Sequence, residues 1–283
     1  MAAIAVVTDS SADIPEALVE RHGIYVVPQI LVVEGERLVE GKDISSREVY
    51  EAVRAGKQVS IGHPPPDDFR VVYKKMRKET EGIVTVTLST IFNPTLISAQ
   101  VAGITYPKLP TEVINSQHVS MGLGFVTLTA AKAAAQGRSL EEAAQEARDA
   151  IPQVRTFFIP ERIEYAYKAK YVPKAAYVFH SPLHQVPILE VKKTHIEALD
   201  YVRQGPKAWA RLVDILQQDI QDRPVQVAIM HADAPDRAQE LATTVQSALR
   251  VTELHVATLT PIVGLRTGPG TVGLALYLQD RVE

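Results

Sequence analysis

Two polar segments of the sequence are able to bind a ligand, and each adjoins an apolar run. The run Ile4 to Val7 ends in Thr8-Asp9-Ser10-Ser11, which supplies hydroxyls and a carboxylate shortly before Pro15, a residue that favours a helix start. Open α/β sheets bind ligands beyond the carboxyl ends of their strands, so this segment indicates a ligand crevice. Near the other end, Gly268-Pro269-Gly270 allows close backbone approach, because glycine lacks a Cβ and proline fixes φ. Together they predict a ligand site assembled from distant parts of the chain.

A serine nucleophile is the alternative chemistry. Ser10 and Ser116 each follow a predicted strand, and histidines and aspartates occur elsewhere in the chain. No Gly-x-Ser-x-Gly elbow surrounds either serine, and Ser10 lacks the glycines that a strained nucleophile turn requires. A small-molecule hydrolase or transferase therefore remains the second hypothesis, behind non-catalytic binding.

Metal and nucleotide sites have weaker support. His180 and His184 stand four residues apart, but Pro182 lies between them and no Glu follows the first histidine, so we expect no metal. Gly122-Leu123-Gly124 is only a fragment of the dinucleotide-binding motif, and no phosphate-binding Gly-rich loop with Lys-Ser/Thr follows a strand. We expect no cofactor.

Composition narrows the class of protein further. The chain has 283 residues, 30 basic against 33 acidic, a net charge of -3 and no cysteine. The absence of a basic excess argues against a nucleic-acid partner, and zero cysteines exclude disulfides and thiolate chemistry. We find no stretch of about 18 apolar residues and no basic-then-apolar leader, which predicts no membrane span and a cytoplasmic protein.

The first half of the chain alternates short β-branched runs with helical patterns, which predicts βαβ units and a largely parallel sheet. The expected strands are Ile4–Val7, Ile24–Val33, Gly82–Leu88 and Glu112–Ile114. The expected helices are Pro15–His22, Ser46–Ala55, Pro66–Lys78, Asn93–Ala102 and Gly122–Gln136.

The second half predicts an α+β arrangement with a mixed sheet. It is preceded by an amphipathic helix over Leu140–Val154, which Ser139 and Glu142 introduce as a capping box and which we interpret as a bridge. We therefore expect an N-terminal α/β domain over residues 1–154 and a C-terminal domain over residues 155–283. Expected strands are Thr156–Ile159, Val186–Val191, Val225–Ala232, Glu253–Leu259 and Thr271–Leu278, with helices Ile163–Lys168, Gly205–Gln221 and Pro235–Leu249.

Several of these pieces, in this order, resemble the DegV family of fatty-acid-binding proteins, which includes the acyl-carrying subunits of bacterial fatty acid kinase. The resemblance covers Thr8 to about Leu278. Its pieces are Thr8 to Pro15, Val26-Val27-Pro28, Gly62 to Phe69, Leu88 to Thr95, Val113 to Ser116, Ser120 to Gly124, Val202-Arg203 with Lys207-Ala208, and Gly268-Pro269-Gly270.

The resemblance implies a two-domain DegV-like α/β fold that binds a long-chain fatty acid in an apolar tunnel, without catalysis. Because the head-group residues depart from the family pattern, another apolar acid or a phospholipid-like anion stays open as the ligand. It also implies a separate kinase chain that phosphorylates the bound carboxylate with ATP. The apolar segments Ile30–Val33, Ile91-Phe92 and Ile262-Val263 are able to line such a tunnel, or belong simply to the core. We expect ligand contacts from Ser60, Ile61, His63, Asn93, Thr95, Arg266, Thr267 and Gly268.

The expected carboxylate end departs from the family pattern in its first two loops. Where relatives have Thr-Ser-Gln-Pro-Ser, this chain has Ser60-Ile61-Gly62-His63-Pro64, which loses hydroxyls and gains an imidazole. Because histidine changes charge in the physiological range, His63 predicts acid binding that weakens as pH rises, unless it points to solvent. Where relatives have Leu-Ser-Gly-Thr, Asn93 offers an amide donor or only an N-cap, and Pro94 at the expected first helical position lacks an N–H.

The third departure replaces the histidine that relatives carry two residues before Gly-Pro-Gly. That position is Arg266, whose planar, permanently charged guanidinium binds a carboxylate bidentately, unless it forms a structural salt bridge to Asp9 or Asp13. The family's Gly-Gly-Arg-Ile appears here as Ala169-Lys170-Tyr171-Val172, so the family's arginine is missing at Tyr171. The basic head-group partner is therefore expected to have moved from one loop to the other.

Overall fold

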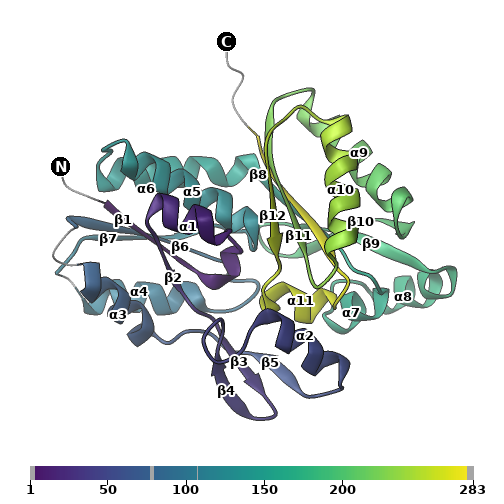
Figure 1. The fold of residues 1–283 in the computed structure, drawn as a ribbon, viewed down its shortest axis with the longest axis horizontal. Helices are drawn as coiled ribbons and strands as arrows, with labels where there is room; N and C mark the ends of the chain where they lie inside the picture. The colour runs from purple at the N-terminus through teal and green to yellow at the C-terminus, as the bar shows by residue number, and fades with distance from the viewer. Residues whose placement is uncertain (1–3, 77–79, 107, 279–283) are drawn as a thin grey trace. The chain divides into compact units, whose positions relative to one another are not determined.

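The computed structural model describes residues 4–76, 80–106 and 108–278, which form two compact units (Figure 1). The first unit ends at Pro152 and the second begins at Gln153. We expected a division after residue 154; that each unit is a domain able to fold alone stays a prediction. Within the described residues, no helix combines the length and apolar character needed to cross a bilayer.

The first unit is built on a parallel sheet in the order β2-β1-β6-β7. The central strand β6 is buried along its whole length, and it pairs with β1 on one side and β7 on the other. A β-branched run without polar alternation is typical of a parallel strand that helices cover on both faces. The strands are β1 Ile4–Asp9, β2 Ile24–Val27, β6 Gly82–Thr87 and β7 Thr111–Asn115.

Helices cover both faces of this sheet (Figure 1). α5 and α6 pack against each other and against β1 and β7, whereas α3 and α4 pack together on the opposite face. Phe69 and Tyr73 of α3 are fully buried against Val7 and Ile83. The helices are α1 Glu16–His22, α3 Pro66–Met76, α4 Thr95–Thr105, α5 Met121–Ala135 and α6 Leu140–Ala150, with short 3-10 helices η1 Ser10–Ala12 and η2 Ile151–Gln153.

A small antiparallel sheet, in the order β4-β3-β5, follows β2. Glu34 and Gly35 join β3 to β4 with φ of 51° and 86°, and positive φ at both central residues is the requirement of a type I′ hairpin turn. The elements are β3 Ile30–Val33, β4 Glu36–Val39, α2 Ser46–Arg54 and β5 Val59–Ile61. The sheet carries Glu40 and Gly62 at the ends of β4 and β5.

The second unit is built on a six-stranded sheet in the order β10-β9-β8-β13-β11-β12. β11 and β12 are parallel, and the other neighbouring strands are antiparallel, so the sheet is mixed as the sequence predicted. The strands are β8 Val154–Ile159, β9 Gln185–Val191, β10 Ile196–Arg203, β11 Val225–His231, β12 Val251–Thr258 and β13 Val272–Leu278.

The core of the second unit lies between this sheet and the helices α9 and α10. Trp209 of α9 is 1% exposed and belongs to one apolar cluster with Leu216, Leu241, Ile229 and Leu274. The helices are α7 Ile163–Lys168, α8 Lys174–His180, η3 Ser181–Leu183, α9 Pro206–Ile220, α10 Pro235–Ala248 and α11 Pro261–Thr267.

The α/β fold class is confirmed, but several element predictions were wrong. Ile24–Val33 is two strands, because Pro28 cannot donate to a ladder and the chain turns there. The helix expected over Leu140–Val154 ends at Ala150, and α6 packs on α5 and β7 within the first unit rather than bridging. α3 ends at Met76, and Lys78 lies outside the described residues.

Other strands and α-helices were missed altogether, namely β4, β5, β10, α8 and α11. α8 buries none of its residues, so its sequence lacks the apolar period that identifies an amphipathic helix. α11 is a seven-residue helix with Pro261 at its start and Gly264 in its middle, a composition that favours a loop.

The capping box of α6 gives a direct test of the local structure. Ser139 Oγ accepts a hydrogen bond from Glu142 N at 3.2 Å, and Glu142 Oε2 accepts one from Ser139 N at 2.8 Å, as the sequence predicted. Ser139→Ala should lower the free energy of unfolding by about 1 kcal/mol in urea titrations. Ser139→Asp, whose carboxylate also caps the helix N-terminus, should retain most of this free energy. Equal losses in both variants would contradict the capping role.

Candidate functional site

Asp9 lies at the carboxyl end of β1 and ties this strand to β6. Its Oδ2 accepts a hydrogen bond from Leu88 N at 3.0 Å, directly after β6. Its Oδ1 accepts from Ser11 N and from Gln29 Nε2, both at 3.1 Å, and from Ser11 Oγ. Burial raises the pKa of the Asp9 carboxyl, and the hydrogen bonds from Ser11, Leu88 and Gln29 oppose that shift. The fully buried side chain therefore organises the crevice as a multiple acceptor.

Ser10 joins the end of β1 to the small sheet. Its Oγ donates a hydrogen bond to Glu40 Oε2 and accepts one from Gln29 N at 2.9 Å. Glu40 is 6% exposed, and its second oxygen, Oε1, has no hydrogen-bond partner. Burial raises the pKa of Glu40 to about 7, the Ser10 hydroxyl opposes this shift, and the nearby charge of Asp9 adds to it. Glu40 is thus a buried carboxyl that changes charge near neutral pH.

The carboxamide of Gln29 continues the network toward α4. Its Nε2 donates to Thr95 Oγ1 at 3.1 Å as well as to Asp9, and its Oε1 accepts from Asn93 Nδ2 at 3.0 Å. Asn93 Nδ2 also lies 3.3 Å from Gly62 O. Gln29 therefore links three segments of the first unit that are far apart in sequence.

Asn93 acts on the helix start differently from the prediction. Pro94 occupies the N-cap position of α4, so it is not the first helical residue and Asn93 is not the cap. Asn93 Oδ1 still accepts from Thr95 N at 3.0 Å and from Thr95 Oγ1 at 2.7 Å, which satisfies a free N–H of the first turn from one residue further back. Both ends of the Asn93 carboxamide are thereby fixed.

The predicted segment Ser60 to His63 lies beside Asn93 through its backbone. Ser60 and Ile61 belong to β5, where they pair with Val32 and Leu31 of β3. The Ser60 and His63 side chains are exposed, and Ile61 is half-buried. The structure thus brings the β5 segment, Asn93 and Thr95 together at Gly62 O, while the ligand contacts of Ser60, Ile61 and His63 stay predictions.

The remaining predicted contacts lie in the second unit, at the end of α11. Thr267 is buried, and its hydroxyl donates to Val263 O at 3.0 Å within the helix. Gly268 follows with φ of 89°, and a Cβ there would lie 2.3 Å from the Tyr165 ring. Only glycine satisfies both the positive φ and the close ring contact, so this position requires a residue without a Cβ.

Arg266 is half-buried one residue before the end of α11. Its Nη1 donates to Ile262 O at 2.5 Å. Burial lowers the pKa of Arg266, and the nearby Tyr171 phenol opposes this shift. Burial in turn raises the pKa of Tyr171 to about 12, against the positive charge of Arg266. The two positions whose residues depart from the family pattern are therefore neighbours in the second unit.

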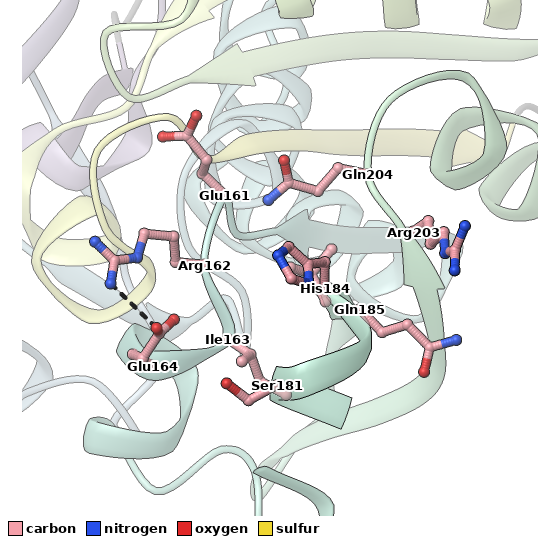
Figure 2. Close-up of a pocket in the computed structure, with 10 residues that line it drawn as sticks. Glu161, Arg162, Ile163, Glu164, Ser181, His184, Gln185, Arg203 and Gln204 are labelled. Atoms are coloured by element: carbon pink, nitrogen blue, oxygen red, sulfur yellow. Dashed lines mark hydrogen bonds and ion pairs between the residues drawn. The ribbon is translucent and has the colours of Figure 1, made fainter. Parts of the chain in front are cut away.

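A pocket of about 490 Å³ also lies within the second unit, between the start of α7 and the ends of η3 and β10 (Figure 2). Arg162 and Glu164 on its wall form an ion pair at 3.1 Å, which Figure 2 shows as a dashed line. His184 lines the same pocket, and its Nδ1 lies 3.2 Å from Pro182 O.

Two residues of the first-unit network, Gln29 and Glu40, were missed from the sequence. Gln29 directly follows the motif Val26-Val27-Pro28, which is the signal that marked this loop. Glu40 had no signal, because a single Glu after Leu38-Val39 reads as the exposed end of a strand. Its burial depends on where β4 lies relative to Ser10.

The hydroxyls of Ser10 and Ser116, the two candidate nucleophiles, form hydrogen bonds with groups other than an imidazole. Ser10 Oγ bonds Glu40 and Gln29 N, as above, and Ser116 Oγ donates to His118 O at 3.2 Å and accepts from His118 N at 3.1 Å. The imidazole of His118, two residues after Ser116, has its Nε2 at 3.2 Å from Ile151 O. Neither serine is thus paired with a histidine base of the kind that activates a nucleophile.

Comparisons with known proteins give consistent matches over the whole chain. The family model described as "Uncharacterised protein, DegV family" matches residues 3–279. A DegV domain-containing protein of Streptomyces coelicolor is 33% identical over 96% of this chain and 98% of its own. A DegV domain-containing protein of Caldanaerobacter subterraneus is 29% identical over 97% of this chain and 98% of its own. The solved structure of a DegV family protein from Thermus thermophilus, described as showing fatty acid binding, matches with a TM-score of 0.89 at 26% identity. The match covers 98% of this chain and 100% of that protein.

The raised pKa of Glu40 predicts that the protein loses stability as pH rises. Between about pH 4.5 and 7 the unfolded chain ionises Glu40 while the folded protein keeps it protonated, so unfolding releases a proton and is favoured by higher pH. Above that window both states are ionised, and the penalty is constant at about 3 kcal/mol.

Thermal unfolding from pH 4.5 to 8.5 should therefore show a larger fall for the wild type than for Glu40→Gln, which is neutral throughout. A slope from Asp9, whose pKa burial also raises, should remain in both proteins. Glu36→Gln, an exposed change on the same strand β4, should follow the wild type. Parallel curves for wild type and Glu40→Gln would disprove the buried titration.

Proposed function

Because the chain belongs to the DegV family, as its sequence motifs indicated, we propose that it binds a long-chain fatty acid without catalysing a reaction on it. The observation that carries the proposal is the likeness to the Thermus thermophilus protein described for fatty acid binding, which extends over almost the whole of both chains. Exposure of an acyl chain costs about 0.8 kcal/mol per CH₂, so a carrier with an apolar site has a large driving force.

The chemistry of the candidate residues supports binding of an acid rather than a neutral lipid. Asn93 Nδ2 donates to Gln29 Oε1 at 3.0 Å and to Gly62 O at 3.3 Å, so a bound carboxylate would take the place of Gly62 O as the second acceptor. Arg266 offers a charged donor fork, and it neighbours Tyr171, where the family pattern has arginine. The guanidinium of Arg266 therefore takes the place of the family's arginine, whose position in the other loop is occupied here by Tyr171. Each head-group assignment, for Ser60, His63, Asn93 and Arg266 and for their neighbours Ile61, Thr95, Thr267 and Gly268, stays a proposal to be tested by its own variant.

The family resemblance also supports a partner. We propose that a separate kinase chain phosphorylates the bound carboxylate, so that this chain supplies the acyl group and the partner supplies ATP. The phosphoryl step needs ATP, which supports a cytoplasmic location. Incubation of the loaded protein with a purified DegV-partner kinase and ATP should yield an acyl phosphate, and the protein alone should yield none.

The second candidate function, a hydrolase or transferase that uses Ser10 or Ser116, has less support. The hydroxyl of Ser10 donates to a buried carboxyl, an arrangement that resembles a base beside a nucleophile. Hydrolysis of p-nitrophenyl esters that is lost in Ser10→Ala or Ser116→Ala would favour this function over carriage.

The carrier proposal predicts a retained ligand. Native mass spectrometry of protein purified from cells should show a mass increment of a saturated or monounsaturated acid of about 16 to 18 carbons, since such a chain buries enough apolar surface to survive purification. Palmitate titration into delipidated protein should then saturate at one site. Ligand-free protein that also fails to bind palmitate would refute carriage.

The head-group proposal predicts that Arg266→Ala weakens palmitate binding by about 2 to 4 kcal/mol, because a carboxylate is left without its charged partner. Binding of 1-hexadecanol should change little. Arg250→Ala, an exposed arginine of the same unit, serves as the matched control and should bind both ligands as the wild type does. Equal losses for acid and alcohol would assign Arg266 to the fold instead.

A further inference from the structure

Glu40 is the least satisfied polar group of the first-unit network. It is 6% exposed, only one of its two oxygens has a partner, and the nearest charged group that acts on it is another carboxylate, Asp9 of β1. The hydroxyl of Ser10 is the hydrogen-bond partner of Glu40 Oε2. A buried carboxylate without a cation is expensive, so its presence here calls for a physical reason.

The hydrogen bonds supply that reason, because they lead from Glu40 to Asn93. Ser10 Oγ accepts from Gln29 N at 2.9 Å, and this leaves the Ser10 proton to donate to Glu40 Oε2. Gln29 N is also next to Pro28, which has no N–H of its own. The Ser10 hydroxyl therefore fixes the backbone from which the Gln29 carboxamide reaches Asn93 Nδ2, at 3.0 Å.

We infer, on the basis of the proposed function, that Glu40 is a positioning residue: through Ser10 and Gln29 it holds Asn93 in the arrangement that binds the fatty acid, and its protonation couples ligand affinity to pH. The neutral carboxyl keeps the chain of hydrogen bonds packed. Ionisation places a second negative charge beside Asp9 with Oε1 unsatisfied, so the segments around Glu40 separate and Asn93 loses its fixed orientation.

The direction of the coupling follows from linkage. If the ligand binds the protonated form better, binding raises the pKa of Glu40, and affinity falls as pH rises through the neutral range. A difference of one unit between the free and bound protein corresponds to about a tenfold change in affinity. By the same reciprocity, binding takes up protons near pH 7.5, which calorimetry detects as a heat that depends on the buffer.

The test compares palmitate affinity at pH 6 and pH 8.5 in wild type and Glu40→Gln, below the concentration at which palmitate aggregates. The glutamine is isosteric, accepts from Ser10 and stays neutral. Since ionisation of the ligand is common to both proteins, the ratio of their affinities isolates the effect of the change at residue 40. We expect a ratio near one at pH 6, and about tenfold tighter binding by Glu40→Gln at pH 8.5, with proton uptake lost in the variant.

Glu36→Gln on β4 is the matched control and should track the wild type at both pH values. A ratio that does not change with pH, or proton uptake that persists in Glu40→Gln, overturns the inference even though palmitate binds. Stability that improves in Glu40→Gln without any change in the affinity ratio has the same consequence, because Glu40 then acts on folding alone.

A second measurement remains decisive if no protein binds palmitate, which would refute the proposed function. The side-chain amide resonance of Asn93, identified by its loss in Asn93→Ser, should shift with pH around neutrality in the wild type and stay constant in Glu40→Gln. A resonance that is insensitive to pH in the wild type contradicts the coupling independently of any ligand.

Discussion

The buried carboxylate of Asp9 is the interaction on which the first unit's site depends. Four donors from three segments converge on it: the backbone and hydroxyl of Ser11, the carboxamide of Gln29 and the backbone N–H of Leu88. A buried acceptor of this kind is stable only while its donors stay in place, so it holds the ends of β1 and β6 and the turn after β2 in one arrangement. If one donor is lost, the buried Asp9 carboxylate is left with an unsatisfied acceptor position, which costs stability.

Polar crowding at this point of the sheet is also the reason that we propose a ligand site here. The carboxyl ends of parallel strands leave unpaired backbone groups, and side chains such as Asn93 and Thr95 satisfy them at the start of α4. The same amides and hydroxyls are suitable donors for an acid. In the second unit, the positive φ at Gly268 and the nearby Tyr165 ring require glycine in the turn that follows Arg266.

Sequence reasoning recovered the features that short-range chemistry encodes. β6, with its continuous β-branched run, the capping box at Ser139 and the mixed sheet of the second unit were all confirmed. It failed where tertiary contacts decide the local structure. α8 has no buried face, and the run Ile24–Val33 hides a turn that the pairing of β3 with β4 and β5 imposes. The N-cap of α4 is Pro94 rather than the expected Asn93. The Asn93 carboxamide instead accepts a hydrogen bond from Thr95 N, the residue after Pro94.

The sequence by itself determined the family, the α/β class and the residue types available to a head group, because motif order and apolar periodicity are local properties of the chain. Only the tertiary structure decided that Glu40 is buried beside Ser10, that Gln29 connects Asp9 to Asn93, and that Arg266 neighbours Tyr171. Each of these depends on which strands pair and in which register. Burial and pKa follow from the surroundings that this pairing creates, and no residue type carries that information on its own.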